Sequence, residues 1–251
     1  MKDEIIKRRS FSSFTGEPLD EQIIDNLVDF ISGLTPPVPD IDWNFDTLPY
    51  LDLMRISRNE PGVKAPHYLA LRAERKNFSL QNSGYIGEMA TLYLTRLGIA
   101  TRWQGSITVP AQDDFPDSLP FVTAIAFGRS DEPFRASAAE ADRLPMKKIA
   151  FGKYERFLPM LEAARLAPSS FNLQPCAYVA DDRGRLHCYR KKPFLNNPRT
   201  SYIQCLDSGA ALAHLEIAAK EMELNPSLVR LTPEPAFKNL VYQATLKFED
   251  R

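Results

Sequence analysis

The chain has 251 residues, 44% of them hydrophobic, and its 31 Lys and Arg are balanced by 32 Asp and Glu. A chain of this length can bury a core without disulfides or a structural metal, and a net charge of −1 provides no basic field that would hold nucleic acid. The longest charge-free apolar stretch, residues 119–128, is about half the roughly 20 residues that a membrane helix needs. The cysteines Cys176, Cys188 and Cys205 form no CxxC pair, which favours a reducing compartment. We therefore expect a soluble, cytoplasmic, globular protein without membrane or nucleic-acid partners.

The N-terminal part predicts one amphipathic helix followed by an irregular segment. Asp20 is a candidate N-cap, and apolar residues from Ile24 to Ile31 recur at i, i+3, i+4 and i+7 before Gly33. Four prolines lie between residues 34 and 59, and they argue against any long helix there. We expect an irregular connection over this segment.

The next elements are a strand, a long helix and a second strand. Residues 65–71 predict a short strand that starts at a proline. Residues 86–97 carry a second apolar helical stripe that ends at Gly98, and residues 121–127 are β-branched and aromatic enough for a buried strand.

The C-terminal part repeats this order. After a polar stretch at residues 128–143, an apolar stripe over residues 157–164 predicts a third helix that ends before Pro168. A hairpin is expected at residues 179–186, then a long helix over residues 206–222, and residues 240–248 alternate like a final strand.

The repeated order predicts an internal duplication. Residues 34–36 match residues 166–168 at an offset of 132, and Ser83-Gly84 match Ser208-Gly209 at an offset of 125. The strands at residues 121–127 and 240–248 match at an offset of about 120. Changes in loop length are enough to explain the drift in offset.

Familiar catalytic and metal motifs are missing from the sequence. His67, His187 and His214 are scattered, without clustered cysteines or carboxylates at ligand spacing, so we predict no metal site. Six basic residues between Arg183 and Arg199 have no acid among them. They could bind an anion or nucleic acid, but a solvated hairpin is the favoured interpretation.

Two segments carry the donors and acceptors that a ligand would need. Arg8-Arg9-Ser10 sets two guanidinium groups and a hydroxyl on one short stretch, which suits a phosphate, although an exposed basic N-terminus is the simpler alternative. Residues 167–175 place two hydroxyls and two amides between two prolines. Such a stiffened polar loop suits a planar heterocycle, and the alternative is a helix-to-strand connector.

These segments resemble the FMN-dependent nitroreductase family. Residues 163–175 resemble its flavin-facing loop, and Arg8-Arg9-Ser10 with Phe14 resemble its phosphate arm. Residues 97–105 resemble its turn beside the flavin, and Arg143 with Leu144-Pro145 resembles its late phosphate-binding arginine. In that family each FMN lies at a homodimer interface, with the arm from one subunit and the loop from the other.

Here the arm and the loop lie in different halves of one chain, as in the single-chain, pseudo-dimeric nitroreductase subgroup. The resemblance implies an α+β fold, an α/β/α sandwich, duplicated into halves 1–150 and 151–251 with one complete FMN site and one degenerate site. The phosphate would be held by Arg8, Arg9, Ser10 and Arg143. The ring and ribityl edge would contact Pro168, Ser169, Ser170 and Asn172, and the N5 side would face the backbone N–H groups of Gln104 and Gly105.

The implied activity is electron transfer from NAD(P)H to a small nitroaromatic or quinone-like acceptor. The flavin does the chemistry, so no catalytic side chain is named. Ser12 and Ala141 stand where the family often has basic residues, and Cys176 replaces a customary Trp, which implies looser FMN. The pseudo-dimer is expected as a monomer, with further association open. A cofactor-free binding or regulatory module and a flavin carrier without turnover are the alternatives.

Overall fold

The structure is a computed structural model that describes residues 1–109, 119–193 and 197–248. The first half contains an antiparallel sheet with the strand order β1-β2-β4-β3. Its elements are α1 (Lys2–Lys7), α2 (Glu21–Ser32), β1 (Trp43–Pro49), α3 (Tyr50–Ile56), β2 (His67–Ala73), α4 (Ser79–Arg96), β3 (Ala100–Trp103) and β4 (Phe121–Gly128).

The second half contains a sheet with the order β5-β6-β7-β9-β8, in which β5 runs parallel to β6 and the other neighbours are antiparallel. Its elements are β5 (Ala150–Gly152), α5 (Leu158–Arg165), β6 (Cys176–Ala180), β7 (Leu186–Lys191), α6 (Pro198–Glu221), β8 (Ser227–Val229) and β9 (Leu240–Lys247). Short 3₁₀ helices lie at Ala138–Glu140, Met146–Lys148, Glu155–Phe157 and Ser170–Asn172.

Helices cover both faces of the first sheet. Successive side chains of a strand point to opposite faces. Leu69 and Leu71 of β2 join the main core, where Leu71 lies against Gly87 of α4. Tyr68, directly before Leu69, points to the other face and packs with Leu53 of α3 in a separate cluster. The predicted α+β class, with a sheet between helical layers, is confirmed.

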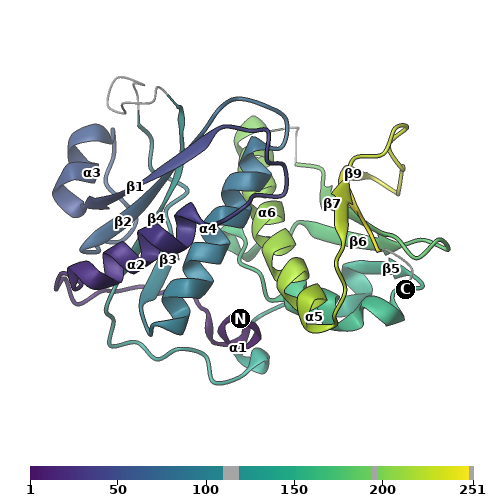
Figure 1. Ribbon diagram of the computed structural model, residues 1–251, viewed down its shortest axis with the longest axis horizontal. Coiled ribbons are helices and arrows are strands. Elements are labelled where there is room, and N and C mark those ends of the chain that lie inside the picture. Colours follow the sequence, from purple (N-terminus) through teal and green to yellow (C-terminus); the bar gives the residue numbers. More distant parts are fainter. Residues whose placement is uncertain (110–118, 194–196, 249–251) are drawn as a thin grey trace.

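Helices α4 and α6 lie side by side between the two sheets (Figure 1). Glycines permit their close crossing, because a Cβ on Gly84 would lie 2.1 Å from the Leu206 carbonyl oxygen and a Cβ on Gly209 would lie 2.0 Å from that of Gln81. Each glycine thus faces the residue three positions before the other glycine. The contact between the helices therefore has an approximate two-fold relation.

The two sheets repeat one topology. In the first, α4 connects β2 to β3, and in the second, α6 connects β7 to β8. The strand order β1-β2-β4-β3 corresponds to β6-β7-β9-β8, and β5 is added at the edge. This repeat is what an internal duplication would produce.

The expected helices and main strands are present, but α4 and α6 begin seven and eight residues before their predicted starts at residues 86 and 206. The prediction of an irregular segment over residues 34–59 is wrong. This segment contains β1 and α3. Pro49 ends β1, an edge strand, and is the N-cap of α3, so its missing N–H disturbs neither element. Asp20 does occupy the N-cap of α2, but its side chain makes no capping hydrogen bond.

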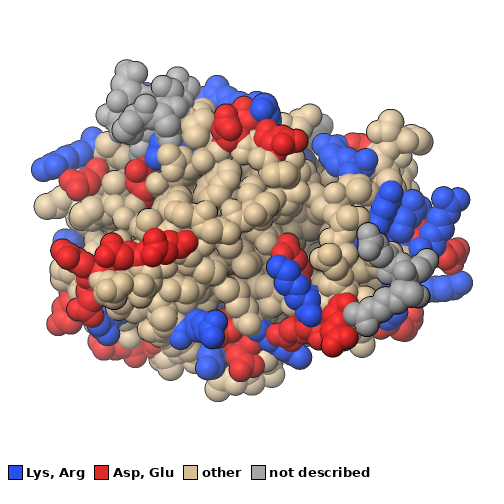
Figure 2. All heavy atoms as spheres, in the orientation of Figure 1, with Lys and Arg blue, Asp and Glu red and all other residues tan. Residues whose placement is uncertain are grey.

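Charges of both signs alternate around the face shown in Figure 2, whose centre is largely uncharged. Within the described ranges, no helix is long and apolar enough to cross a bilayer. The same residues contain no group of three or more His, Cys, Asp or Glu side chains that could hold a metal ion.

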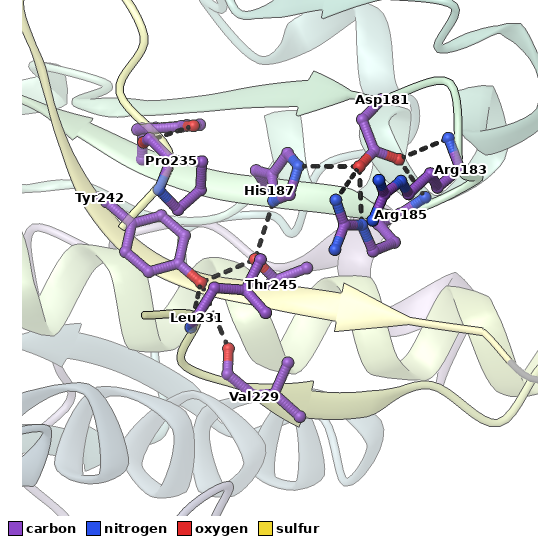
Figure 3. A network of polar contacts seen from close by, with 10 residues as sticks. Asp181, Arg183, Arg185, His187, Val229, Leu231, Pro235, Tyr242 and Thr245 are labelled. Carbon is purple, nitrogen blue, oxygen red and sulfur yellow. Dashed lines mark hydrogen bonds and ion pairs between the residues drawn. The ribbon is translucent and has the colours of Figure 1, made fainter. Parts of the chain in front are cut away.

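The basic hairpin between β6 and β7 is tied into the second sheet (Figure 3). Asp181 accepts hydrogen bonds from the backbone N of Arg183 at 3.0 Å and from Arg185 Nε at 2.6 Å. Its Oδ2 lies 3.2 Å from Nε2 of His187, whose Nδ1 lies 2.8 Å from Thr245 Oγ1 on β9. Arg185 and His187 are thus paired within the protein, which leaves less of this hairpin for an anion.

Candidate functional site

A cavity of about 670 Å³ is lined by both halves of the chain. The first half contributes the segment after α1 and the end of β3, and the second half contributes the loop after α5 and one side of α6. Seven residues predicted from the sequence line it, namely Ser10, Gln104, Gly105, Pro168, Ser169, Ser170 and Asn172. The fold therefore brings one residue of the predicted arm, Ser10, and the predicted loop to one cavity.

The loop between α5 and β6 has an unusual backbone. Phe171, Asn172 and Gln174 have φ values of +52°, +55° and +48°, in the left-handed region that costs energy for side chains other than glycine. The Gln174 backbone N donates to Ser169 Oγ at 2.9 Å and fixes the turn. The result leaves Phe171 90% exposed beside the cavity. Such backbone conformations, held by surrounding contacts, are typical of ligand sites.

Arg143 holds this loop in place through hydrogen bonds on the side away from the cavity. Its Nη1 donates to Asn172 Oδ1 at 2.8 Å, and its Nη2 donates to the carbonyl oxygens of Leu166 and Ala167, both at 3.3 Å. Arg143 is not among the residues that line the cavity. Its guanidinium therefore reaches the cavity wall through Asn172.

Arg8 and Arg9 diverge from Ser10, and neither is among the residues that line the cavity. Arg9 forms an ion pair with Glu132, with 3.3 Å between Nη2 and Oε2, and donates to a backbone carbonyl nearby. Arg8 is only 4% exposed, and its Nε lies 3.5 Å from Glu88 Oε1. Of these two predicted phosphate ligands, Arg8 is the one that points into the protein.

Arg8 belongs to a group of buried arginines that sequence reasoning only partly found. Burial lowers the pKa of Arg135 to about 10, with further lowering from the neighbouring charges of Arg8 and Arg143. Burial and then Arg8 also lower the pKa of Arg143 to about 10. The Nε atoms of all three are buried without a hydrogen-bond partner. Guanidinium groups this close together favour an anion among them.

The carboxylate nearest to this cluster is already engaged. Glu88 is fully buried, and its Oε1 lies 2.8 Å from His214 Nε2. His214 Nδ1 lies 2.8 Å from the carbonyl oxygen of Ala163, which only accepts, so Nδ1 carries a proton. Glu88 is thus shared between His214 and Arg8, so it is not free to neutralise the arginine group by itself.

The end of β3 forms the opposite wall. The backbone N–H of Gln104, predicted to face the ligand, donates to Ala124 O at 2.8 Å, so the sheet uses it and that role is wrong. The Gln104 side chain instead accepts from Gly62 N at 2.8 Å. Gly105 faces open space where a side chain would stand. Arg102, which the sequence reasoning did not single out, lines the cavity and donates from Nη1 to Phe11 O at 3.1 Å.

Asp207 of α6 is a second wall residue that sequence reasoning missed. Its Oδ1 accepts from the backbone N of Ser170 at 3.0 Å and from Ser170 Oγ at 3.3 Å. Burial raises the pKa of this carboxyl to about 7, against the lowering effect of the Ser170 hydrogen bonds. The available signal in the sequence was its position directly before Ser208-Gly209, the dipeptide that matches Ser83-Gly84.

Fold and site together define a nitroreductase-type α+β protein, and the comparisons agree. Residues 1–219 match the model of a family described as "Putative TM nitroreductase". The chain belongs to this nitroreductase family and so to the oxidoreductases. No curated protein matches the chain.

Three solved structures illustrate the similarity. A protein titled a putative nitroreductase from Thermotoga maritima is 22% identical with a TM-score of 0.64, over 98% of this chain and 92% of its own. A nitroreductase family protein from Clostridium difficile is 15% identical with a TM-score of 0.48, over 61% and 96%. An FMN-dependent nitroreductase from Clostridium difficile R20291 is 16% identical with a TM-score of 0.42, over 54% and 91%. At these identities the first comparison supports the fold, and the other two carry no further argument.

Proposed function

We propose that the chain binds one FMN in the cavity between its halves and uses it to pass electrons from NAD(P)H to a small nitroaromatic or quinone-like acceptor. Membership of the nitroreductase family supports an oxidoreductase, and the resemblance of residues 163–175 to that family's flavin-facing loop supports FMN. The observation that carries the proposal is that Ser10 and the loop at residues 168–172 line one cavity.

The residues present fit this cofactor. The cavity volume of about 670 Å³ lies within the range of roughly 300 to 1,000 Å³ common for small-molecule sites. Hydroxyls and an amide from the loop face a ring edge, and Gly105 leaves room for close approach. The group of Arg8, Arg135 and Arg143, which meets the cavity wall where Arg143 contacts Asn172, suits a phosphate because the Nε donors of all three lack partners.

FMN supplies reversible electron and hydride transfer when bound. In the proposal, Ser10, Arg8, Arg135 and Arg143 hold the phosphate, and Arg9 has a secondary role beside Glu132. Each charge-assisted hydrogen bond contributes on the order of 1.5–3 kcal/mol. Pro168, Ser169, Ser170 and Asn172 orient the ring and ribityl edge, and Gly105 offers the backbone N–H opposite them.

The acceptor side is inferred from Phe171. This aromatic side chain lines the cavity and is 90% exposed, although large apolar side chains usually bury most of their surface. A flat aromatic or quinone-like molecule would stack on such a ring. We therefore place the acceptor at the side of the cavity where Phe171 lies.

We also propose that the two halves, residues 1–150 and 151–251, derive from one duplicated unit and form a pseudo-dimer in a single chain. The reciprocal contacts of Gly84 and Gly209 and the repeated strand order support this. On this proposal one chain contains a complete flavin site, and a monomer is sufficient for activity.

The phosphate site is tested by comparing FMN with riboflavin, which lacks the phosphate. Wild-type protein should bind FMN more tightly than riboflavin, and Arg135→Met should reduce that preference tenfold or more while riboflavin affinity stays the same. Arg230→Met, on an exposed pair with Glu234 in the second sheet, is the control. Flavin fluorescence titration gives the six dissociation constants, one for each flavin with each of the three proteins. Equal preference in wild type and Arg135→Met would reject the arginine group as the phosphate site.

A cofactor-free binding module is the second candidate. Arg143 closes on Asn172 at 2.8 Å, and Arg8 contacts Glu88, so two of the proposed phosphate ligands have partners within the protein. An absorbance spectrum of protein isolated without added flavin, followed by FMN titration, separates the two functions. A module of this kind would show neither visible absorbance nor binding.

A further inference from the structure

Two polar residues occupy matching places on the central helices. Asn82 lies two residues before Gly84 on α4, and Asp207 lies two residues before Gly209 on α6. Since the two glycines face each other's helix reciprocally, Asn82 and Asp207 are counterparts. Both are buried, with Asn82 0% and Asp207 7% exposed.

The counterparts hold equivalent loop residues in different ways. Asn82 satisfies both polar groups of Val38, because its Oδ1 accepts from Val38 N at 3.2 Å and its Nδ2 donates to Val38 O at 2.7 Å. Asp207 Oδ1 accepts from the backbone N and the hydroxyl of Ser170, which lies 132 residues after Val38. Its Oδ2 is buried without a hydrogen-bond partner. Of the two counterparts, Asp207 lines the large cavity and Asn82 does not. An acid thus stands at the position beside the cavity, and an amide stands at the other.

No described cation forms an ion pair with Asp207. Its carboxyl lies on the wall of the large cavity and also on a small cavity of about 20 Å³ behind the loop. The titratable or charged side chains that surround it on the packed elements are Arg102 of β3, Arg165 of α5, Cys176 and Tyr178 of β6, and Arg199 and Cys205 of α6. Burial raises the pKa of Cys176 to about 12 and raises the pKa of Tyr178 well above its ordinary value, so both are neutral and offer no counter-charge.

We propose that Asp207 is a positioning residue for the bound flavin and that it carries a proton in the complex. The inference rests on the proposed function, because it takes a flavin as the ligand of the large cavity. A ligand there replaces the water of the adjoining cavity with a medium of lower polarity, beside a carboxyl whose buried Oδ2 already lacks a partner, and this disfavours the charged form further. The neutral acid also matches Asn82, with one acceptor atom and one donor atom, and holds Ser170 without placing a charge beside the ring.

The proposal predicts proton uptake on binding. In the free protein, burial raises the pKa of Asp207 to about 7, so the carboxyl is mostly ionised above pH 7. Because the bound state is proposed to contain the neutral acid, flavin binding above pH 7 must take up one proton. Affinity then falls with rising pH, by up to roughly tenfold per pH unit. Asp207→Asn keeps the acceptor and supplies a permanent donor, so its affinity should not depend on pH in this range.

The test is a titration of riboflavin into the full chain between pH 6 and 8.5, because riboflavin has no phosphate to titrate. Wild-type affinity should fall at least tenfold across this range, and Asp207→Asn affinity should change less than twofold. Calorimetry of the wild type at pH 8 in buffers with different ionisation enthalpies should show uptake of close to one proton per flavin bound. This second measurement does not depend on a variant.

The possible outcomes separate this inference from the proposed function. Flavin binding with no proton uptake, and with the same pH profile in wild type and Asp207→Asn, would overturn the role of Asp207. The proposed flavin site would be unaffected by that result. Failure of wild type to bind riboflavin or FMN at any pH would overturn the proposed function, and the inference with it.

Discussion

Asp207 couples the stability of the fold to pH even without a ligand. Burial raises the pKa of its carboxyl from an ordinary 3.8 to about 7, so between these values the folded chain holds a proton that the unfolded chain releases. The free energy of unfolding therefore falls as pH rises from about 4 to 7 and stays lower above 7. At about 1.4 kcal/mol per pKa unit, the full effect is on the order of 4 kcal/mol.

Replacement of Asp207 by Asn should remove this dependence. We expect Asp207→Asn to have nearly the same free energy of unfolding as wild type at pH 4 and to be more stable by a few kcal/mol at pH 8. Urea denaturation of both proteins across this range measures the difference. A constant difference at all pH values would show that Asp207 titrates normally in the folded chain.

Single residues of the site differed in how far the sequence could predict them. The loop at residues 167–175 was found because its two hydroxyls and two amides lie close together in the sequence. Arg135 was not found, because it lies in a polar stretch and joins Arg8 and Arg143 only through the fold. The role given to Gln104 failed because strand pairing, which links it to Ala124, decides which backbone N–H is free.

The central pair of helices depends on two glycines. Gly84→Ala and Gly209→Ala would each force a Cβ to within about 2 Å of a backbone oxygen on the other helix. Backbone atoms yield less than side chains, so we expect a loss of about 2 kcal/mol or more of unfolding free energy in each variant. Urea denaturation curves provide the measurement.

Gly33→Ala is the matched control. Gly33 is the C-cap of α2 with φ −83°, and a Cβ there would meet its nearest atoms at 3.6 Å. This substitution should be neutral or slightly stabilising. If Gly84→Ala cost no more than Gly33→Ala, the close crossing of α4 and α6 would be refuted.

Elements with one apolar face were predictable, and elements defined by their neighbours were not. The stripe of α2 indicated its length almost to the residue. Strand β1 has no strict alternation, because it is a half-buried edge strand that forms by pairing with β2. The 3-residue strands β5 and β8 are too short to show a pattern, and they exist because the edges of the second sheet bind them.

At the scale of the whole molecule, the two halves should unfold together. Gln81 Nε2 donates to Gln243 Oε1 at 2.8 Å, and Tyr85 Oη donates to Glu216 Oε2 at 2.9 Å, so polar bonds reinforce the packed helices across the halves. A large buried contact of this kind favours one cooperative transition.

The chain contains natural probes for each half. Both tryptophans lie in the first half and all three cysteines lie in the second. Tryptophan fluorescence and thiol reactivity, followed through one urea titration, should therefore give the same midpoint. Midpoints that differ by more than the experimental error would indicate two independently stable domains and weaken the pseudo-dimer proposal.

The stoichiometry of FMN binding tests the central claim most directly, because one composite site is expected in a chain whose second site is degenerate. Titration of FMN into monomeric protein of known concentration, with the absorbance of the bound flavin as the signal, should saturate at one FMN per chain. Saturation at two per chain, or no binding at all, would contradict the account of a single site shared between the halves.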